Sequence, residues 1–261
     1  MKFHVGLVHN FGDRFAEAVA LHESVIAKLR ASGFAVSASM HGEQTPAVDP
    51  GPLRGFKQQL AHSALKRKYC RRTLEARSIP TIRKQFSKAL VAANRQERLK
   101  MWVDGEISRK HSEIWRDSNR NNADWVVVLE DDALPKPGWE VRIDNLVEDL
   151  VSFRPQYVDL AGGFKTETVT SHRSFVRKTS SGVLFAKVMT NTSCGYAMGR
   201  DFVERALKHF ESFPNKDLVA IDTFVNDLST VGKTTESQRS LHTSPTIFAH
   251  GSMTGDFESW R

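Results

Sequence analysis

The chain has 261 residues, of which 40% are apolar and 26% charged, so its composition is that of a folded protein rather than a disordered one. No apolar run approaches the roughly 18–20 residues that span a bilayer, and the first residues lack the apolar stretch of a signal peptide. The two cysteines are too few for a disulfide-stapled scaffold or a four-cysteine zinc site, and they suit a reducing compartment. We therefore expect a cytoplasmic protein with enough residues for a sizeable core.

The net charge of +7 is concentrated in one segment. Residues 54–116 contain 17 Lys and Arg against 5 acidic residues, which leaves +12 there and −5 on the rest of the chain. Such a block indicates an anionic partner: nucleic acid, phospholipid headgroups, or a phosphorylated or acidic glycan. Apolar residues interleave these charges with helical spacing, so a solvated helical face is a compatible alternative. Peripheral attachment to the inner membrane is one role that this segment could have.

The first forty residues predict a strand, a helix and a second strand. Phe3–Val8 has the composition of a strand, residues 14–32 have helical periodicity that ends at Gly33, and Phe34–Ser39 forms the next strand. This order is typical of a doubly wound α/β domain. Further along we expect a loop at 41–55, helices at 108–119, 139–153, 200–210 and 218–228, strands at 158–160, 183–189 and 246–249, and a turn at 193–196.

The most informative segment is WVVVLEDDAL, residues 125–134. Its unbroken apolar run predicts a strand that is buried on both faces, and the strand ends in Glu130, Asp131 and Asp132. Adjacent carboxylates repel each other unless a cation neutralises them, and open α/β sheets bind ligands at the carboxyl ends of their strands. Oxygen ligands of this kind suit Mg²⁺ or Mn²⁺ bridging to phosphates. We therefore predict a metal site for a diphosphate. The alternative is that the acids cap the following turn or pair with basic residues.

The segment VVVLEDDALP resembles the signature of glycosyltransferase family 25, the lipopolysaccharide-type β-galactosyltransferases of the GT-A fold. Other segments resemble that family in the same order, and together they cover most of the chain. They are VGLVHNFGDRFAEAV, His111 and Trp115 four residues apart on one helical face, NTSCGYAMGRDFVERAL, AIDTFVNDL and SPTIFAHGSMTGDFESWR. The resemblance implies one GT-A-like domain over residues 1–261, with a mostly parallel central sheet flanked by helices and a basic helical insertion at about 54–116.

The resemblance also implies a metal site with Mn²⁺ or Mg²⁺ as the cofactor. Asp132 is then the main metal ligand, and Glu130 or Asp131 contacts the ribose, the sugar or a metal-bound water. Asp131 is also a candidate ligand. A C-terminal histidine commonly completes such a site, and His250 is the candidate. Its alternative role is that of a hydrogen-bonded loop histidine.

Transfer with inversion needs a base for the acceptor hydroxyl, and Asp222 at the start of a helix is our candidate. It could instead be an acid that the helix dipole favours.

The nucleoside is expected to meet His9, Asn10 and Asp13. Gly195 and Tyr196 fit a tight turn against the sugar, although Tyr196 could equally be a core residue. Cys194 is interpreted as a small packed residue rather than a nucleophile.

The sequence therefore favours a metal-dependent glycosyltransferase that moves a galactose-like sugar from a UDP-sugar. Its acceptor would be a glycan or glycolipid of a bacterial surface polymer such as lipopolysaccharide or capsule, and an anionic acceptor would suit the basic segment. A metal-dependent nuclease or nucleotidyltransferase that uses the basic segment is the alternative. The sequence has no recognisable nucleic-acid-binding motif and no second carboxylate cluster for a two-metal site, which disfavours nucleic acid as a partner. A third hypothesis is a non-catalytic module that keeps the fold.

Overall fold

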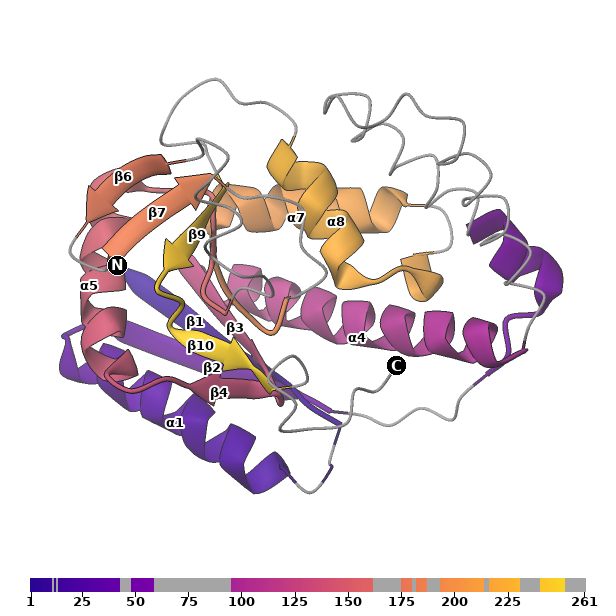
Figure 1. The fold of residues 1–261 in the computed structure, drawn as a ribbon, viewed down its shortest axis with the longest axis horizontal. Helices are drawn as coiled ribbons and strands as arrows, with labels where there is room; N and C mark the ends of the chain where they lie inside the picture. Colours follow the sequence, from indigo (N-terminus) through magenta and orange to yellow (C-terminus); the bar gives the residue numbers. More distant parts are fainter. Residues whose placement is uncertain are drawn as a thin grey trace.

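The computed structural model describes residues 1–10, 12, 14–42, 48–58, 95–161, 175–179, 182–186, 193–213, 216–230 and 240–251. An eight-stranded sheet lies at the centre (Figure 1). From one edge to the other its strands are β2 (Ala35–His41), β1 (Lys2–Val8), β3 (Trp125–Glu130), β8 (Gly195–Gly199), β5 (Tyr157–Asp159), β9 (Ser240–Ser244), β7 (Gly182–Ala186) and β6 (Phe175–Thr179). Strands β8 and β7 run opposite to the others. The sheet is thus mixed but mostly of one direction.

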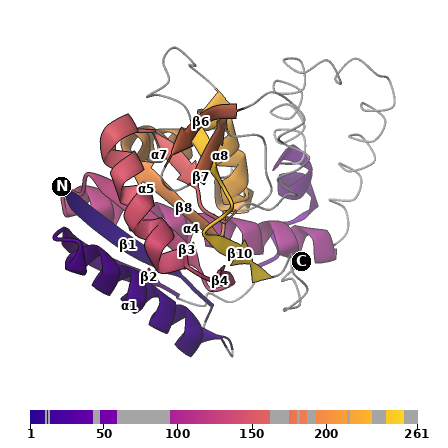
Figure 2. The same cartoon turned by 60° about the vertical axis from the view of Figure 1, so that its left-hand side comes forward.

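Helices cover both faces of this sheet, as Figures 1 and 2 show. Helices α1 (Phe15–Ala31) and α5 (Trp139–Phe153) lie on one face, and α4 (Arg95–Arg120), α7 (Arg200–Ser212) and α8 (Ile221–Thr230) lie on the other. A separate antiparallel ribbon joins β4 (Ala133–Pro135) to β10 (Phe248–His250). The fold is therefore the layered α/β arrangement that the sequence predicts.

The βαβ opening is confirmed. Strands β1 and β2 pair in parallel, and α1 connects them with its buried residues at helical spacing. Gly33 follows the helix with a φ of +84°, the left-handed conformation that a glycine adopts without strain at this position. Local sequence pattern therefore determines this part of the fold.

Strand β3 is buried on both faces, as predicted. Val127 and Leu129 pack in the core under α1 and α5, whereas Val126 and Val128 pack in the core under α4, α7 and α8. Each such side chain contributes about 1.5–3 kcal/mol when it is fully buried. The strand is held by parallel β1 on one side and antiparallel β8 on the other.

The turn predicted at 193–196 is wrong, because Gly195–Gly199 forms strand β8 at the middle of the sheet. The glycines at its two ends resemble turn residues, but each faces a bulky neighbour instead. A Cβ on Gly195 would lie 3.2 Å from the ring of Phe248, and one on Gly199 would lie 3.5 Å from the indole of Trp125. The small residues make room for these aromatic rings.

Strand β9 was missed because its sequence, SLHTS, is polar and lacks an apolar pattern. Its residues Ser240–Thr243 are nevertheless buried, and two of its polar side chains lie against Asp159 on the neighbouring strand. Thr243 Oγ1 donates to the carbonyl oxygen of Asp159, and His242 Nδ1 lies 3.3 Å from the carboxylate of Asp159. Strands β4 and β6 were also missed, and a helical segment at 52–58 begins inside the loop predicted at 41–55.

The predicted basic insertion at 54–116 needs correction, because residues 95–116 belong to the core helix α4. This helix packs on β1 so closely that a Cβ on Gly6 would lie 2.2 Å from Ile114 Cγ2. The basic residues of this part are each matched with a partner rather than left as an open cationic face. Those partners are Asp49 for Arg95 and Arg98, Glu97 for Lys100, Glu106 for Arg109, Glu113 and Glu211 for Arg116, and Asn10 and the His9 carbonyl for Lys110. Residues 59–94 lie outside the described part of the chain.

Among the residues that the structure describes, no helix combines the length and apolarity that a membrane span requires.

His4 on β1 should make stability depend on pH. Its buried ring lies 3.0 Å and 2.9 Å from the hydroxyls of Ser37 and Ser39. Burial, with the charges of His22 and His41 and against that of Asp117, lowers the pKa of His4 to about 4 from 6.5. Its contribution is therefore complete above pH 6.5 and is lost as the pH falls toward 4, at a cost of about 3 kcal/mol.

Urea unfolding at pH 7.5 and at pH 4.5 measures this loss. The variant His4→Gln, which cannot titrate, should lose less stability than the wild type between the two pH values. Equal losses in the two proteins would contradict the assignment.

Candidate functional site

The three acids at the end of β3 point in different directions. Glu130 continues the strand, so its side chain lies on the same face as Val128, toward α4. Asp131 reaches the end of β1, and Asp132 reaches β10. The three carboxylates are thereby held apart, and each has its own set of neighbours.

Glu130 lies at the end of a chain of buried hydrogen bonds. His111 Nε2 on α4 is 3.0 Å from Glu130 Oε1, and Ser193 Oγ donates to the same oxygen at 2.8 Å. The other ring nitrogen of His111 is 2.7 Å from the hydroxyl of Tyr196, which also accepts the indole N–H of Trp115 at 3.0 Å. We call this set of five residues the Glu130 relay.

The chemistry of these groups fixes the direction of the relay. The indole of Trp115 can only donate and a carboxylate can only accept, so His111 carries a proton on Nε2. A neutral His111 then accepts a hydrogen bond from the Tyr196 hydroxyl at Nδ1, whereas the protonated ring, whose charge lowers the pKa of Glu130, donates to that hydroxyl. Burial would raise the pKa of Glu130, but the hydrogen bonds from His111 and Ser193, helped by the charges of His111 and His250, outweigh burial and lower it. Glu130 is therefore a carboxylate.

The second oxygen of Glu130 remains available to a ligand. Both hydrogen bonds fall on Oε1, whereas Oε2 makes none with the residues that the structure describes. The side chain is 16% exposed, so the relay holds a carboxylate that is only partly buried.

Asp131 contacts the end of β1. Its Oδ2 accepts the backbone N–H of Asn10 at 3.0 Å, and the side-chain oxygen of Asn10 accepts from Lys110 Nζ at 2.6 Å. Burial and the charge of Glu130 raise the pKa of Asp131, and the Asn10 N–H, Arg14 and Lys110 oppose that rise. The structure therefore brings Asp131 to Asn10, both predicted, rather than to the group around Asp132.

His9 is buried and does not offer its ring to a nucleoside. The ring packs 4.6 Å from that of Phe15, centroid to centroid, and a Cβ on Gly42 would lie 1.8 Å from it. Burial, with the charges of Lys110 and His41, lowers the pKa of His9. Its carbonyl oxygen accepts a hydrogen bond from Lys110. Asp13, predicted at the same strand end, lies outside the described residues.

Asp132 and His250 lie together, as predicted. Asp132 Oδ2 is 3.1 Å from His250 Nδ1, and both side chains are slightly exposed. Cys194 joins them: one ligand atom of each of the three residues lies within 4.8 Å of the others. Burial, followed by the charges of Asp132 and Glu130, raises the pKa of the Cys194 thiol well above its usual value. The sequence did not predict that Cys194 lies beside Asp132 and His250, since it precedes β8 and is far from both residues in the chain.

Gly195 and Tyr196 do not form a surface for a sugar. Tyr196 is fully buried on β8, and its ring stacks between those of His111 and Tyr157. The predicted role of Tyr196 as a stacking surface is thus corrected, because its buried hydroxyl instead supports His111 within the Glu130 relay. The residues that sequence reasoning left without a role are His111, Ser193 and Lys110. The four-residue spacing of His111 and Trp115 is the one local signal for the relay.

Asp222 lies in the first turn of α8, nearly buried. Helix α8 packs in the same core as Trp115 and Tyr196 of the relay, and the charge of Asp222 contributes to raising the pKa values of Tyr157, Tyr196 and Cys194. The position at a helix N-terminus favours a carboxylate as well.

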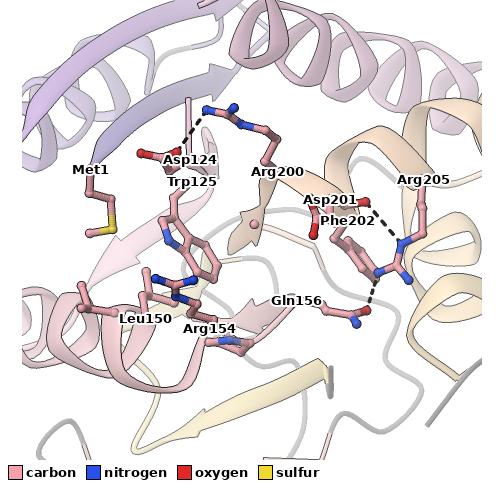
Figure 3. Close-up of a pocket in the computed structure, with 13 residues that line it drawn as sticks. Met1, Asp124, Trp125, Leu150, Arg154, Gln156, Arg200, Asp201, Phe202 and Arg205 are labelled. Carbon is pink, nitrogen blue, oxygen red and sulfur yellow. Dashed lines mark hydrogen bonds and ion pairs between the residues drawn. The ribbon is translucent and has the colours of Figure 1, made fainter. Parts of the chain in front are cut away.

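A cavity of about 830 Å³ lies at the opposite end of β3. Figure 3 shows its lining, with Arg200 reaching Asp124 and Arg205 reaching Gln156. The acidic group is not part of that lining. A hollow of about 460 Å³ lies nearer, between α1 and β4, and includes Ala133, the residue after Asp132.

Comparison with protein-family models and with curated proteins gives no match. Among solved structures, the chain aligns with a glycosyltransferase involved in the glycosylation of the major capsid of PBCV-1. The alignment covers 95% of this chain and 91% of that one, with 9% identity and a TM-score of 0.35. A likeness this distant supports no conclusion about the activity.

Removing the hydroxyl of Tyr196 should destabilise the fold. In Tyr196→Phe the buried N–H of Trp115 loses its acceptor, and such an unsatisfied group costs about 1–3 kcal/mol. Trp115→Phe removes the donor itself, so the double variant should lose less stability than the sum of the two single losses. Urea unfolding of all four proteins measures the coupling, and strictly additive losses would show that the hydrogen bond contributes nothing.

Proposed function

We propose that this protein is a metal-dependent glycosyltransferase that moves a galactose-like sugar from a UDP-sugar onto a bacterial surface glycan with inversion. One observation carries the proposal. Asp132 and His250, distant in sequence, converge 3.1 Å apart just beyond the end of a central strand. Ligand sites in open α/β sheets lie at this end of the strands.

The donor set fits a divalent cation. A carboxylate oxygen and an imidazole nitrogen are suitable ligands for Mn²⁺, the predicted ion together with Mg²⁺. Asp132 and His250 would hold it. When bound, such an ion supplies a positive charge that stabilises a leaving diphosphate.

The protein's own groups would bind the remainder of the donor. Oε2 of Glu130 is fixed by the relay and can accept a hydrogen bond from a ribose or sugar hydroxyl. Asn10 is held between Asp131 and Lys110, which sets the position of the β1 end where we place the nucleoside.

Asp222 would take the proton from the acceptor hydroxyl as the sugar is transferred. A base in the first turn of a packed helix is held in one position, and its low exposure restricts access of water. The acceptor would approach from this side, with α8 as one wall.

The nucleic-acid alternative is less well supported. The described cations of α4, which account for the C-terminal part of the basic block, are matched with acids or with polar groups of the β1 end. They do not form a stripe of open positive charge of the kind that binds phosphate backbones.

Thermal unfolding with UDP and Mn²⁺ tests the donor site. At a nucleotide concentration about 100 times its Kd, binding adds ~2.7 kcal/mol, a Tm rise of roughly 5–10 °C in a chain of this length. Asp132→Asn should abolish the rise. The matched control Asp124→Asn, at the other end of β3 in the cavity of Figure 3, should keep it.

The opposite pattern would place the nucleotide in the cavity of Figure 3. No rise in the wild type, together with salt-sensitive binding of DNA or RNA, would favour the nucleic-acid enzyme.

Release of UDP from UDP-galactose in the presence of acceptor glycans tests the role of Asp222. A general base contributes about 10²–10⁴-fold to the rate, so Asp222→Asn should lose that much turnover while keeping the Tm rise with UDP and Mn²⁺. Asp227→Asn is the matched control. Asp227 lies on the same helix as Asp222, and its Oδ2 is 2.8 Å from Nε2 of His209 on α7. Equal losses in both variants would indicate a structural role.

A further inference from the structure

Cys194 lies close to Asp132 and His250, although the metal site proposed above uses only those two residues as ligands. The three residues come from three segments: the end of β3, the residue before β8, and the end of β10. One ligand atom from each lies within 4.8 Å of the other two. Carboxylate, thiol and imidazole are the three side-chain types that bind borderline-soft divalent cations.

The backbone holds this group together. The N–H of Glu130 donates to the carbonyl oxygen of Cys194 at 2.8 Å, and the N–H of Gly251 donates to that of Asp132 at 2.8 Å. His250 is further fixed by the pairing of β10 with β4, where it faces Ala133. Backbone hydrogen bonds therefore link the three chain segments that carry the proposed ligands.

We propose that Cys194 is the third protein ligand of this metal site, so that the site binds thiophilic ions such as Zn²⁺, Co²⁺ and Cd²⁺ through sulfur. The inference rests on the proposed function for the purpose of the site, but not for the binding itself. On binding, the thiol loses its proton to solvent and a metal–sulfur bond forms. Mg²⁺ and Mn²⁺ bind thiolates poorly and favour oxygen ligands, so their binding would depend little on Cys194.

The alternative role for Cys194 is that of a small, buried packing residue. The two roles differ in what an ion would experience. A packing cysteine contributes to stability and leaves no spectroscopic trace of metal–sulfur bonding, whereas a ligand gives one.

Titration of the wild-type protein with Co²⁺ provides the first test. We expect a sulfur-to-cobalt charge-transfer band in the near ultraviolet that saturates at one ion per chain. The band should disappear in Cys194→Ser and persist in the matched control Cys70→Ser, which removes the other cysteine of the chain. No band at saturation, a band that persists in Cys194→Ser, or one lost in Cys70→Ser, would overturn the proposal.

Affinities provide the second test. Loss of partners that merely support a ligand costs about 10–100-fold in metal affinity, so loss of a direct ligand should weaken Cd²⁺ binding by at least about tenfold. Mn²⁺ binding to Cys194→Ser should change far less. Equal changes for the two ions would contradict sulfur ligation.

Should Cys194→Ser fail to fold, cadmium-113 NMR of the wild type decides, because its chemical shift separates sulfur from oxygen and nitrogen ligands. None of these readouts requires a nucleotide. A sulfur signature without a Tm rise from UDP would uphold this site and reject the glycosyltransferase. A Tm rise with UDP but no sulfur signature would support the glycosyltransferase and would show that Cys194 is only a packing residue.

Discussion

The repulsion among three consecutive carboxylates is the constraint on which the rest of this site depends. Strand β3 ends at Glu130 and the chain turns at Asp131 and Asp132, so the three side chains leave in different directions and have different partners. Each is supported from a different part of the fold: His111 on α4, the backbone of Asn10 after β1, and His250 on β10. The layers of the protein are therefore arranged so that one strand can end in three negative charges.

The core and the site are continuous on the α4 side of the sheet. Trp115 and Tyr196 are among the largest fully buried side chains, and they also position Glu130 through His111. Buried polar groups of this kind stabilise a fold when every member has a partner, and destabilise it when one is removed. A change in the packing of α4 against β8 would therefore move the carboxylate of Glu130.

What could be predicted from the sequence depended on whether the signal was local. The βαβ opening and the burial of β3 follow from apolar patterns within single segments. Strand β8 could not be predicted in this way. The glycines at its ends are typical of turns, and only the structure shows that they make room for Phe248 and Trp125. Among the site residues, Asp132 and His250 followed from the family resemblance and do lie together. Cys194 and Lys110 gave no local signal, since their contacts depend on where the fold places β10 and α4.

The late position of β10 in the chain has a consequence for biosynthesis. His250 leaves the ribosome after all eight strands of the main sheet, whereas Asp132 and Cys194 are already in the nascent chain. An ion held by the three proposed ligands would therefore gain its full set only when the ribbon with β4 closes. On this proposal, full metal affinity would develop with the completion of the fold rather than before it.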